Sequence, residues 1–152
     1  MARAPLRGLV WLFLLACVAI TGCGGGRKVP EEENRLTKLA RLYGRSQSKF
    51  RGPPPSVDAL KEFARSLDAD GLKSIGLESS DLDQIFVSSR DNEPFVYRKP
   101  AKGVGMPGPG ASSEVVFYEK TGKNGKRYVA YVTAKVEEVD EAKFKQLVPE
   151  TP

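Results

Sequence analysis

The stretch from residue 114 to residue 132 reads EVVFYEKTGKNGKRYVAYV and carries the clearest structural signal in the chain. Two β-type runs, at 114–120 and 127–132, flank the tetrapeptide Lys123-Asn124-Gly125-Lys126. Because Asn-Gly tolerates positive φ at both central positions of a tight turn, this stretch predicts a β-hairpin. Apolar residues fall on both faces of its strands. We therefore expect the hairpin to form the centre of a small antiparallel sheet that helices cover.

The segments on either side of the hairpin supply the rest of the predicted sheet. Short β-type runs at 85–87 and 95–97 precede it, and a turn at 88–94 (SSRDNEP) separates them. After the hairpin, residues 135–139 either extend its second strand or turn back beside it.

An amphipathic helix is predicted at 31–48, after Pro30 and three acidic residues that favour the positive end of the helix dipole. Its apolar residues recur at helical spacing: Leu36, Leu39, Ala40, Leu42 and Tyr43. We expect its Glu and Arg residues to form a solvated face.

Further helices follow from local start and stop signals. Gly52-Pro53-Pro54-Pro55 ends the first helix, and Ser56 caps a second at 57–67. Residues 68–83 are rich in turn formers and have room for a short helical turn. Asp140 caps a last short helix, with Phe144 and Leu147 inward. The predicted fold class is α+β: one small domain at 31–149, with a mobile loop at 99–113.

Composition argues against several classes of enzyme. The 152 residues include 24 basic and 19 acidic side chains, no His and two Cys. The commonest general base and zinc ligand is therefore absent, and a disulfide-rich scaffold is excluded. A Ser nucleophile would need a Lys base, and Ser46 and Lys49 have that spacing at a polar helix end. We expect no enzyme, no catalytic residue, no cofactor and no metal.

Three short motifs resemble ligand sites but favour simpler interpretations. Residues 103–108 match the dinucleotide pattern GxGxxG, yet the prolines that follow forbid the helix that the pattern needs. Asp68-Ala69-Asp70-Gly71 resembles part of a calcium loop, but Glu78 comes one residue too late, so we expect a helix-terminating turn. Asp81 and Asp83 are interpreted as an exposed turn.

The first residues form an export signal. Arg3 and Arg7 precede Leu9–Ile20, an apolar run of 12 residues, whereas a membrane-spanning helix needs about 20. Ile20-Thr21-Gly22-Cys23 resembles the bacterial lipobox. The resemblance implies a lipoprotein signal peptide at 1–22, a diacylated Cys23 and a flexible tether at 23–30. A plain signal peptide with a coincidental Cys, or an uncleaved anchor, are the alternatives.

Processing at Cys23 would place the protein in the bacterial cell envelope. Position 24 is Gly rather than the Asp that often retains lipoproteins at the inner membrane, so the resemblance implies the outer membrane, facing the periplasm or the exterior. Loss of Arg3 and Arg7 leaves 22 basic against 19 acidic residues, a net charge of +3. We expect the membrane, through the lipid, as partner and no nucleic acid.

Basic residues are concentrated near the hairpin turn, and such a cluster is typical of a site for an anionic partner. They are Lys120, Lys123, Lys126 and Arg127, with Lys143 and Lys145 close in sequence. An envelope protein or an anionic polymer is the expected partner, although solubility and protection of a strand edge explain such charges equally well.

From residue 35 the layout resembles small pilin-like lipoproteins and prepilin-type proteins of unknown function. The matching strings are GPPPSVDAL at 52–60, IFVSSRD at 85–91, VFYEK at 116–120, RYV at 127–129 and DEAKF at 140–144. The resemblance implies a pilin-head-like fold and carries over no catalytic residue. We expect a lipid-anchored binding or structural module of the envelope. The alternative is an accessory, pseudopilin-like component of a pilus or type II secretion-like apparatus, and a hydrolase ranks third.

Overall fold

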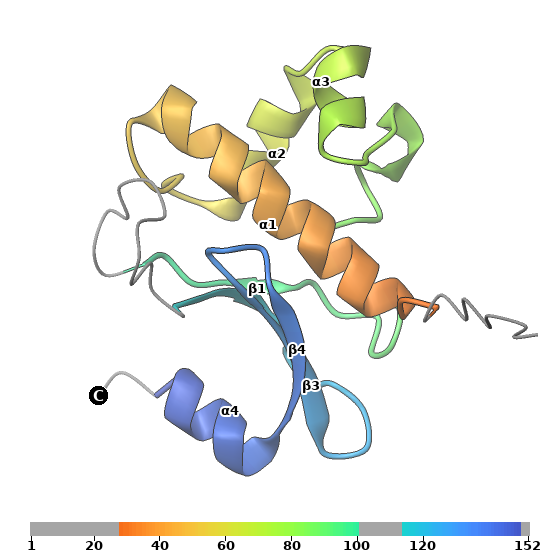
Figure 1. The fold of residues 1–152 in the computed structure, drawn as a ribbon, viewed down its shortest axis with the longest axis vertical. Coiled ribbons are helices and arrows are strands. Elements are labelled where there is room, and N and C mark those ends of the chain that lie inside the picture. Colours follow the sequence, from red (N-terminus) through yellow and green to blue (C-terminus); the bar gives the residue numbers. More distant parts are fainter. Residues whose placement is uncertain (1–27, 101–113, 150–152) are drawn as a thin grey trace, which may run out of the picture.

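The computed structural model describes residues 28–100 and 114–149, and it confirms the α+β class. In chain order its elements are α1 (Glu31–Phe50), α2 (Val57–Arg65), α3 (Ala69–Ser74), the 3-10 turn η1 (Ser79–Asp81), β1 (Val96–Tyr97), β2 (Val115–Tyr118), β3 (Lys126–Tyr131), β4 (Val136–Asp140) and α4 (Glu141–Leu147). Figure 1 shows α1 lying between the sheet and a layer made by α2 and α3, with α4 on the other side of the sheet. None of the helices in the described ranges has the length and apolar character needed to span a membrane.

The sheet is an antiparallel meander in the order β1-β2-β3-β4, so the β2–β3 hairpin lies at its centre as predicted. At the hairpin turn, Asn124 has φ 54° and Gly125 has φ 70°. Lys123 and Lys126 exchange both of their backbone hydrogen bonds, at 2.9 and 3.0 Å. The Asn-Gly pair therefore plays the role expected from the sequence.

The segment after β3 turns back rather than extending the strand. Ala134 adopts φ 61°, and its N–H donates to the Tyr131 carbonyl at 2.9 Å. Tyr131 in turn donates its N–H to the Lys135 carbonyl at 2.9 Å. This tight connection starts β4, which pairs with β3 from Val136 to Asp140.

The prediction of a strand at 85–87 is wrong. The N–H of Ile85 donates to the Asp81 carbonyl at 2.9 Å and the N–H of Val87 to the Gln84 carbonyl at 3.1 Å, so the segment is a series of turns. A single bridge joins Val87 to Pro94. The turn at 88–94 does form, closed by the Ser88 N–H on the Glu93 carbonyl at 3.0 Å.

The helix caps follow the sequence closely, with one correction. Ser56 accepts the Ala59 N–H at 3.1 Å and Asp140 accepts the Lys143 N–H at 2.8 Å, as expected. Asp68, however, accepts the Gly71 N–H at 2.7 Å and so begins α3, although the sequence suggested a helix-terminating turn there.

Two apolar clusters lie on opposite faces of the sheet. The larger packs α1, α2 and the 72–86 segment against one face, and includes Leu39, Tyr43, Phe63 and Phe117. The smaller joins the other face to α4 through Val129, Tyr131, Val139 and Phe144. A register shift between Val115 and Phe117 places Val116 and Phe117 together in the larger cluster.

Candidate functional site

Four polar residues from different parts of the chain meet at the first turn of α1, and we call them the Ser88 cluster. They are Glu32, Ser88, Arg90 and Glu119. Glu32 is 2% exposed, and Ser88 and Glu119 are fully buried. The Ser88 hydroxyl oxygen lies 3.2 Å from Glu32 Oε1 and 3.1 Å from Glu119 Oε1. A single hydroxyl therefore links two buried carboxyl groups.

The Ser88 hydroxyl is shared between two buried carboxyl groups, and burial sets the direction of the Glu119 pKa. Ser88 has one proton to donate, and its oxygen already accepts the Arg90 N–H at 3.1 Å. Burial raises the pKa of Glu119, although the Tyr128 N–H, at 2.8 Å from Oε2, and the Arg90 guanidinium act in the opposite direction. The Ser88 hydroxyl, which can donate to Oε1 of either carboxyl group, also acts to lower the pKa of Glu119.

Glu32 accepts hydrogen bonds through one oxygen only. Its Oε1 accepts the N–H groups of Ser89 and of Arg90, the latter at 3.0 Å, besides the Ser88 hydroxyl. Its Oε2 is buried and has no hydrogen-bond partner among the described residues. A hollow of about 350 Å³ lies beside the cluster, and its lining includes Glu31, Glu32, Ser89, Lys123, Tyr128 and Glu138.

Arg90 forms one wall of that hollow and is held on several sides. Its guanidinium lies 4.8 Å from the centre of the Tyr128 ring and 2.9 Å from Glu138 Oε1. It also lies 3.6 Å from Glu119 Oε2, and its side chain is 17% exposed. These contacts fix the guanidinium in place beside the buried acids.

A second hollow, of about 410 Å³, lies between α4 and the β1–β2 side of the sheet, and we call it the basic hollow. Arg98, Lys120 and Arg127 line it together with Tyr118 and Phe144. Arg127 lies 4.3 Å from the Phe144 ring centre and 3.1 Å from Glu141 Oε2, while Arg98 donates to the Leu147 carbonyl at 3.1 Å. Among the described residues that line it, three are cationic and none is acidic.

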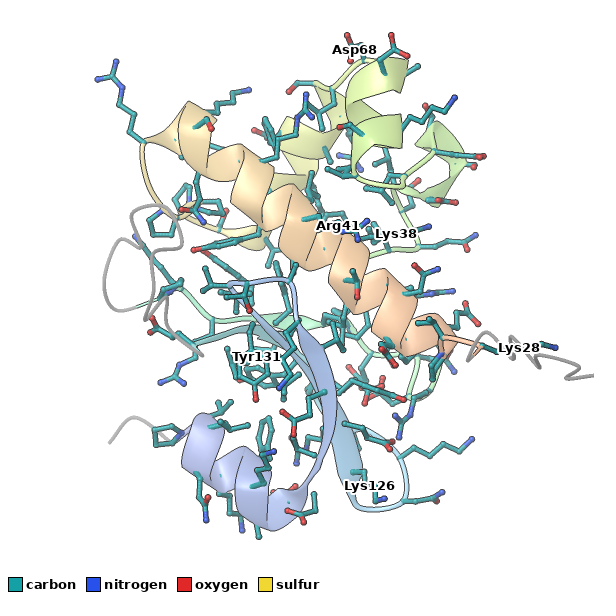
Figure 2. All side chains as sticks on the ribbon, in the orientation of Figure 1. Lys28, Lys38, Arg41, Asp68, Lys126 and Tyr131 are labelled. Carbon is teal, nitrogen blue, oxygen red and sulfur yellow. The ribbon has the colours of Figure 1, made fainter. Side chains whose placement is uncertain are left out.

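The structure divides the basic residues that the sequence grouped together. Lys120 and Arg127 reach the basic hollow, whereas Lys123 lines the hollow at Glu32. Lys143 pairs with Glu137, and Lys126 and Lys145 are exposed. Figure 2 shows Lys126 pointing outward at the hairpin end. The third cation of the basic hollow is Arg98, which the sequence analysis did not single out.

The other candidate pairs are not assembled. Ser46 is fully buried rather than at a polar helix end, and its hydroxyl donates to the Tyr43 carbonyl at 2.7 Å. The Lys49 ammonium lies 5.6 Å from the centre of the Phe63 ring. Asp81 pairs with Lys38 and Asp83 with Arg65. Asp68 lies far from the hairpin, at the opposite end of the molecule (Figure 2). Within 28–100 and 114–149 no three His, Cys, Asp or Glu side chains group to hold a metal ion.

The sequence did not identify the Ser88 cluster. The expectation that the Glu and Arg residues of α1 form a solvated face is wrong for Glu32, which is buried, and for Arg35, which donates to the carbonyls of Gln84 and Val87 at 3.0 and 2.8 Å. The three charged residues of the cluster each sit in an ordinary polar context in the sequence, and no local pattern marks them.

Several predictions fall on residues outside the described ranges. These are the signal peptide at 1–22, the lipid attachment at Cys23, most of the tether at 23–30, and the loop at 99–113 with its glycine motif, apart from residues 28–30 and 99–100.

Comparison with known proteins adds nothing to the assignment: no family model matches the chain, and neither a curated protein nor a solved structure matches it.

Proposed function

We propose that this protein is a lipid-anchored, extracytoplasmic binding or structural module of a bacterial cell envelope. The observation that carries the proposal is the string Ile20-Thr21-Gly22-Cys23, placed at the end of a 12-residue apolar run that follows Arg3 and Arg7. Charge, run length, small residues and Cys occur in the order that lipoprotein signals require. Two or three acyl chains on Cys23 would hold the chain stably at the membrane.

The start of the folded domain is compatible with such an anchor. α1 begins at Glu31, eight residues after Cys23. Even fully extended, that stretch reaches about 28 Å, so the domain would stay close to the bilayer surface. The outer membrane is the proposed location, because Gly follows Cys23.

Binding rather than catalysis is the proposed role of the domain. The Ser88 hydroxyl, which lies within hydrogen-bond distance of two carboxyl groups, is fully buried and hydrogen-bonded on both sides. The basic hollow supports a place for an anionic group, since Arg98, Lys120 and Arg127 line it together with three aromatic side chains, although Lys120 also pairs with Glu93 at 3.1 Å and Arg127 with Glu141 at 3.1 Å. An anionic envelope polymer or an acidic segment of an envelope protein has the chemistry that fits.

Replacement of Cys23 tests the anchor, and the second cysteine supplies a matched control. The wild-type chain and the Cys17→Ser variant should be processed and enter the detergent-rich phase after Triton X-114 separation, because Cys17 lies inside the segment that is removed. Cys23→Ser should accumulate as the unprocessed precursor. Processing and partitioning of Cys23→Ser identical to those of the wild type would overturn the proposal.

An accessory, pseudopilin-like role is the second candidate. The feature that favours it is the arrangement of one long helix, α1, packed across an antiparallel meander of four strands, in the element order that a pilin-like head would have. Crosslinking in cells followed by affinity purification would distinguish the two. Recovery of pilus or type II secretion components supports the accessory role, and their absence favours the independent module.

A further inference from the structure

We propose that the basic hollow binds an acidic protein segment in which an aromatic side chain lies next to a carboxylate. The inference deepens the proposed function and rests on it for the anionic half of the ligand. The hollow combines cations with an apolar surface: Arg98, Lys120 and Arg127 line it together with three aromatic side chains and with Val96, Val148 and Pro149. A ligand that used only the cations would leave that apolar surface in contact with water.

The hollow exists because α4 covers only part of the sheet. α4 has seven residues and packs mainly on β3 and β4, and it lies alone on this side of the sheet in the described part of the chain (Figure 1). Val96 of β1 pairs with Tyr118 of β2 directly opposite, so both side chains point to the face that carries α4. Both residues are half-buried. The β1–β2 half of this face is therefore an apolar floor that the helix leaves partly open.

Of the three cations in the hollow, only Arg98 lacks a carboxylate partner among the described residues. Lys120 and Arg127 each pair with a glutamate, at 3.1 Å in both cases. Arg98 donates to the Leu147 carbonyl at 3.1 Å, and a guanidinium offers five N–H groups, so donors remain for a bidentate carboxylate. One uncompensated positive charge matches a single carboxylate better than a densely charged polyanion.

The floor of the hollow favours an aromatic neighbour for that carboxylate. The Tyr118 and Phe144 rings meet edge to face with their centres 5.1 Å apart, and the Arg127 guanidinium lies 4.3 Å from the centre of the Phe144 ring. A further ring beside Tyr118 would extend this arrangement and remove apolar surface from water. The volume of about 410 Å³ lies near the lower end of the range for small-ligand sites, about 300–1,000 Å³, so the hollow has room for one or two side chains. Polysaccharide and polyphosphate chains have no aromatic group and would use the cations alone.

The test compares three blocked dipeptides on the ¹⁵N-labelled full chain, purified in dodecyl maltoside and followed by two-dimensional NMR at constant ionic strength. Acetyl-Phe-Glu-amide carries the ring and the acid, acetyl-Ala-Glu-amide only the acid, and acetyl-Phe-Gln-amide only the ring. We expect saturable shifts of the Arg98 and Tyr118 amide signals with the first, at a Kd of about 1 mM or tighter. The second should bind about 2- to 12-fold more weakly, which is the gain that an aromatic pair provides. The third should also bind more weakly, because it leaves Arg98 without a carboxylate.

Three variants locate the binding. Arg98→Gln should weaken both acidic dipeptides at least about twofold. Arg41→Gln removes a guanidinium from an exposed position on α1, on the opposite side of the sheet (Figure 2), and as the matched control should bind like the wild type. Tyr118→Leu keeps an apolar side chain but removes the ring, so the two acidic dipeptides should bind it equally. The comparison of the dipeptides on the wild type needs no variant and decides the question even if Tyr118→Leu fails to fold.

The outcomes separate this inference from the proposed function. Equal binding of the two acidic dipeptides to the wild type, with both weakened by Arg98→Gln, would overturn the aromatic preference and leave the anionic site in place. Binding of acetyl-Phe-Glu-amide that Arg98→Gln leaves unchanged, or no saturable shift up to about 10 mM, would also overturn the inference. If Arg98→Gln leaves the binding of polyglutamate unchanged as well, the anionic site of the proposed function fails with it. The lipid anchor is tested separately by the cysteine variants.

Discussion

The hydroxyl oxygen of Ser88 lies 3.1 Å from the Oε1 of Glu119, and neither side chain has any exposed surface. The contact joins the loop that follows η1 to the end of β2, across 31 positions of sequence. Buried polar networks raise the cost of any single unsatisfied member, because no water is present to replace a lost partner. The stability of this domain should therefore depend on polar residues as well as on its apolar core.

Removal of the bridging hydroxyl should destabilise the domain. Ser88→Ala takes one hydrogen-bond partner from each of two buried carboxyl groups, and we expect a loss of about 1–3 kcal/mol in the free energy of unfolding. Urea denaturation followed by circular dichroism measures it. The control is Ser89→Ala, at the exposed neighbouring position, which should lie within about 0.5 kcal/mol of the wild type. Equal effects of the two substitutions would contradict the assigned role of Ser88.

Glu119 should make stability depend on pH. Burial raises its pKa above the ordinary 4.5, so the folded chain binds this proton more tightly than the unfolded chain does. Its contribution to stability is thus fully present at low pH and is lost as the pH rises from about 4.5 through the raised pKa. Glu119→Gln imitates the protonated form, with its oxygen toward the Tyr128 N–H and its NH₂ toward Ser88.

The measurement for Glu119 is the difference in unfolding free energy between Glu119→Gln and the wild type, determined by urea denaturation from pH 4 to pH 8. The unfolding free energy of the variant should rise relative to that of the wild type as the pH rises through this window, because only the wild type has an ionisable group at position 119. A difference that stays constant, or that moves the other way, would exclude a raised pKa.

Removal of the hydroxyl group should have opposite effects on the stability of the domain at two neighbouring tyrosines, Tyr43 and Tyr97. The Tyr43 hydroxyl is buried with no partner among the described residues, and burial raises its pKa to about 12. The Tyr97 hydroxyl donates to the Pro54 carbonyl at 2.8 Å. Tyr43→Phe should leave stability unchanged or raise it by about 1 kcal/mol, whereas Tyr97→Phe should lower it by about 1 kcal/mol. Thermal unfolding of the pair measures both, and a larger loss in Tyr43→Phe would show that its hydroxyl has a partner.

The basic hollow should carry the affinity for polyanions. We expect the double variant Arg98→Gln/Lys120→Gln to bind a soluble polyglutamate more weakly by about 2- to 30-fold, on the basis of about 0.2–1 kcal/mol for each exposed ion pair. Lys126→Gln/Lys145→Gln removes the same charge from exposed positions outside the hollow and serves as the control. Fluorescence anisotropy with a labelled polymer gives both constants. Equal weakening in the two double variants would mean that net charge, and not the hollow, determines binding.

The features that the sequence predicted correctly are those fixed by a few adjacent residues. Asn124-Gly125 specifies its turn through backbone preference alone, and Ser56 and Asp140 each cap a helix three residues from the N–H they accept. Such signals remain valid in almost any tertiary setting. The central hairpin and most helix boundaries could therefore be placed before the structure was known.

The features that sequence reasoning missed depend on distant partners. Residues 85–87 have the composition of a strand, but a helical carbonyl, that of Asp81, takes the Ile85 N–H. Glu32 looks like a helix-start acid, yet its partner hydroxyl on Ser88 is 56 positions away. Periodicity reports which side chains are apolar, and it cannot report that a charged side chain will find buried donors in another part of the fold.

Mass spectrometry of the amino-terminal peptide of the mature protein tests the membrane placement most directly. The protein should be isolated from the membranes of the producing cell and its amino-terminal peptide sequenced by mass spectrometry. We expect a peptide that begins at Cys23, with the sulfur and the new amino group carrying acyl chains. A chain that begins at Met1, or one that begins elsewhere with an unmodified Cys23, would contradict the account.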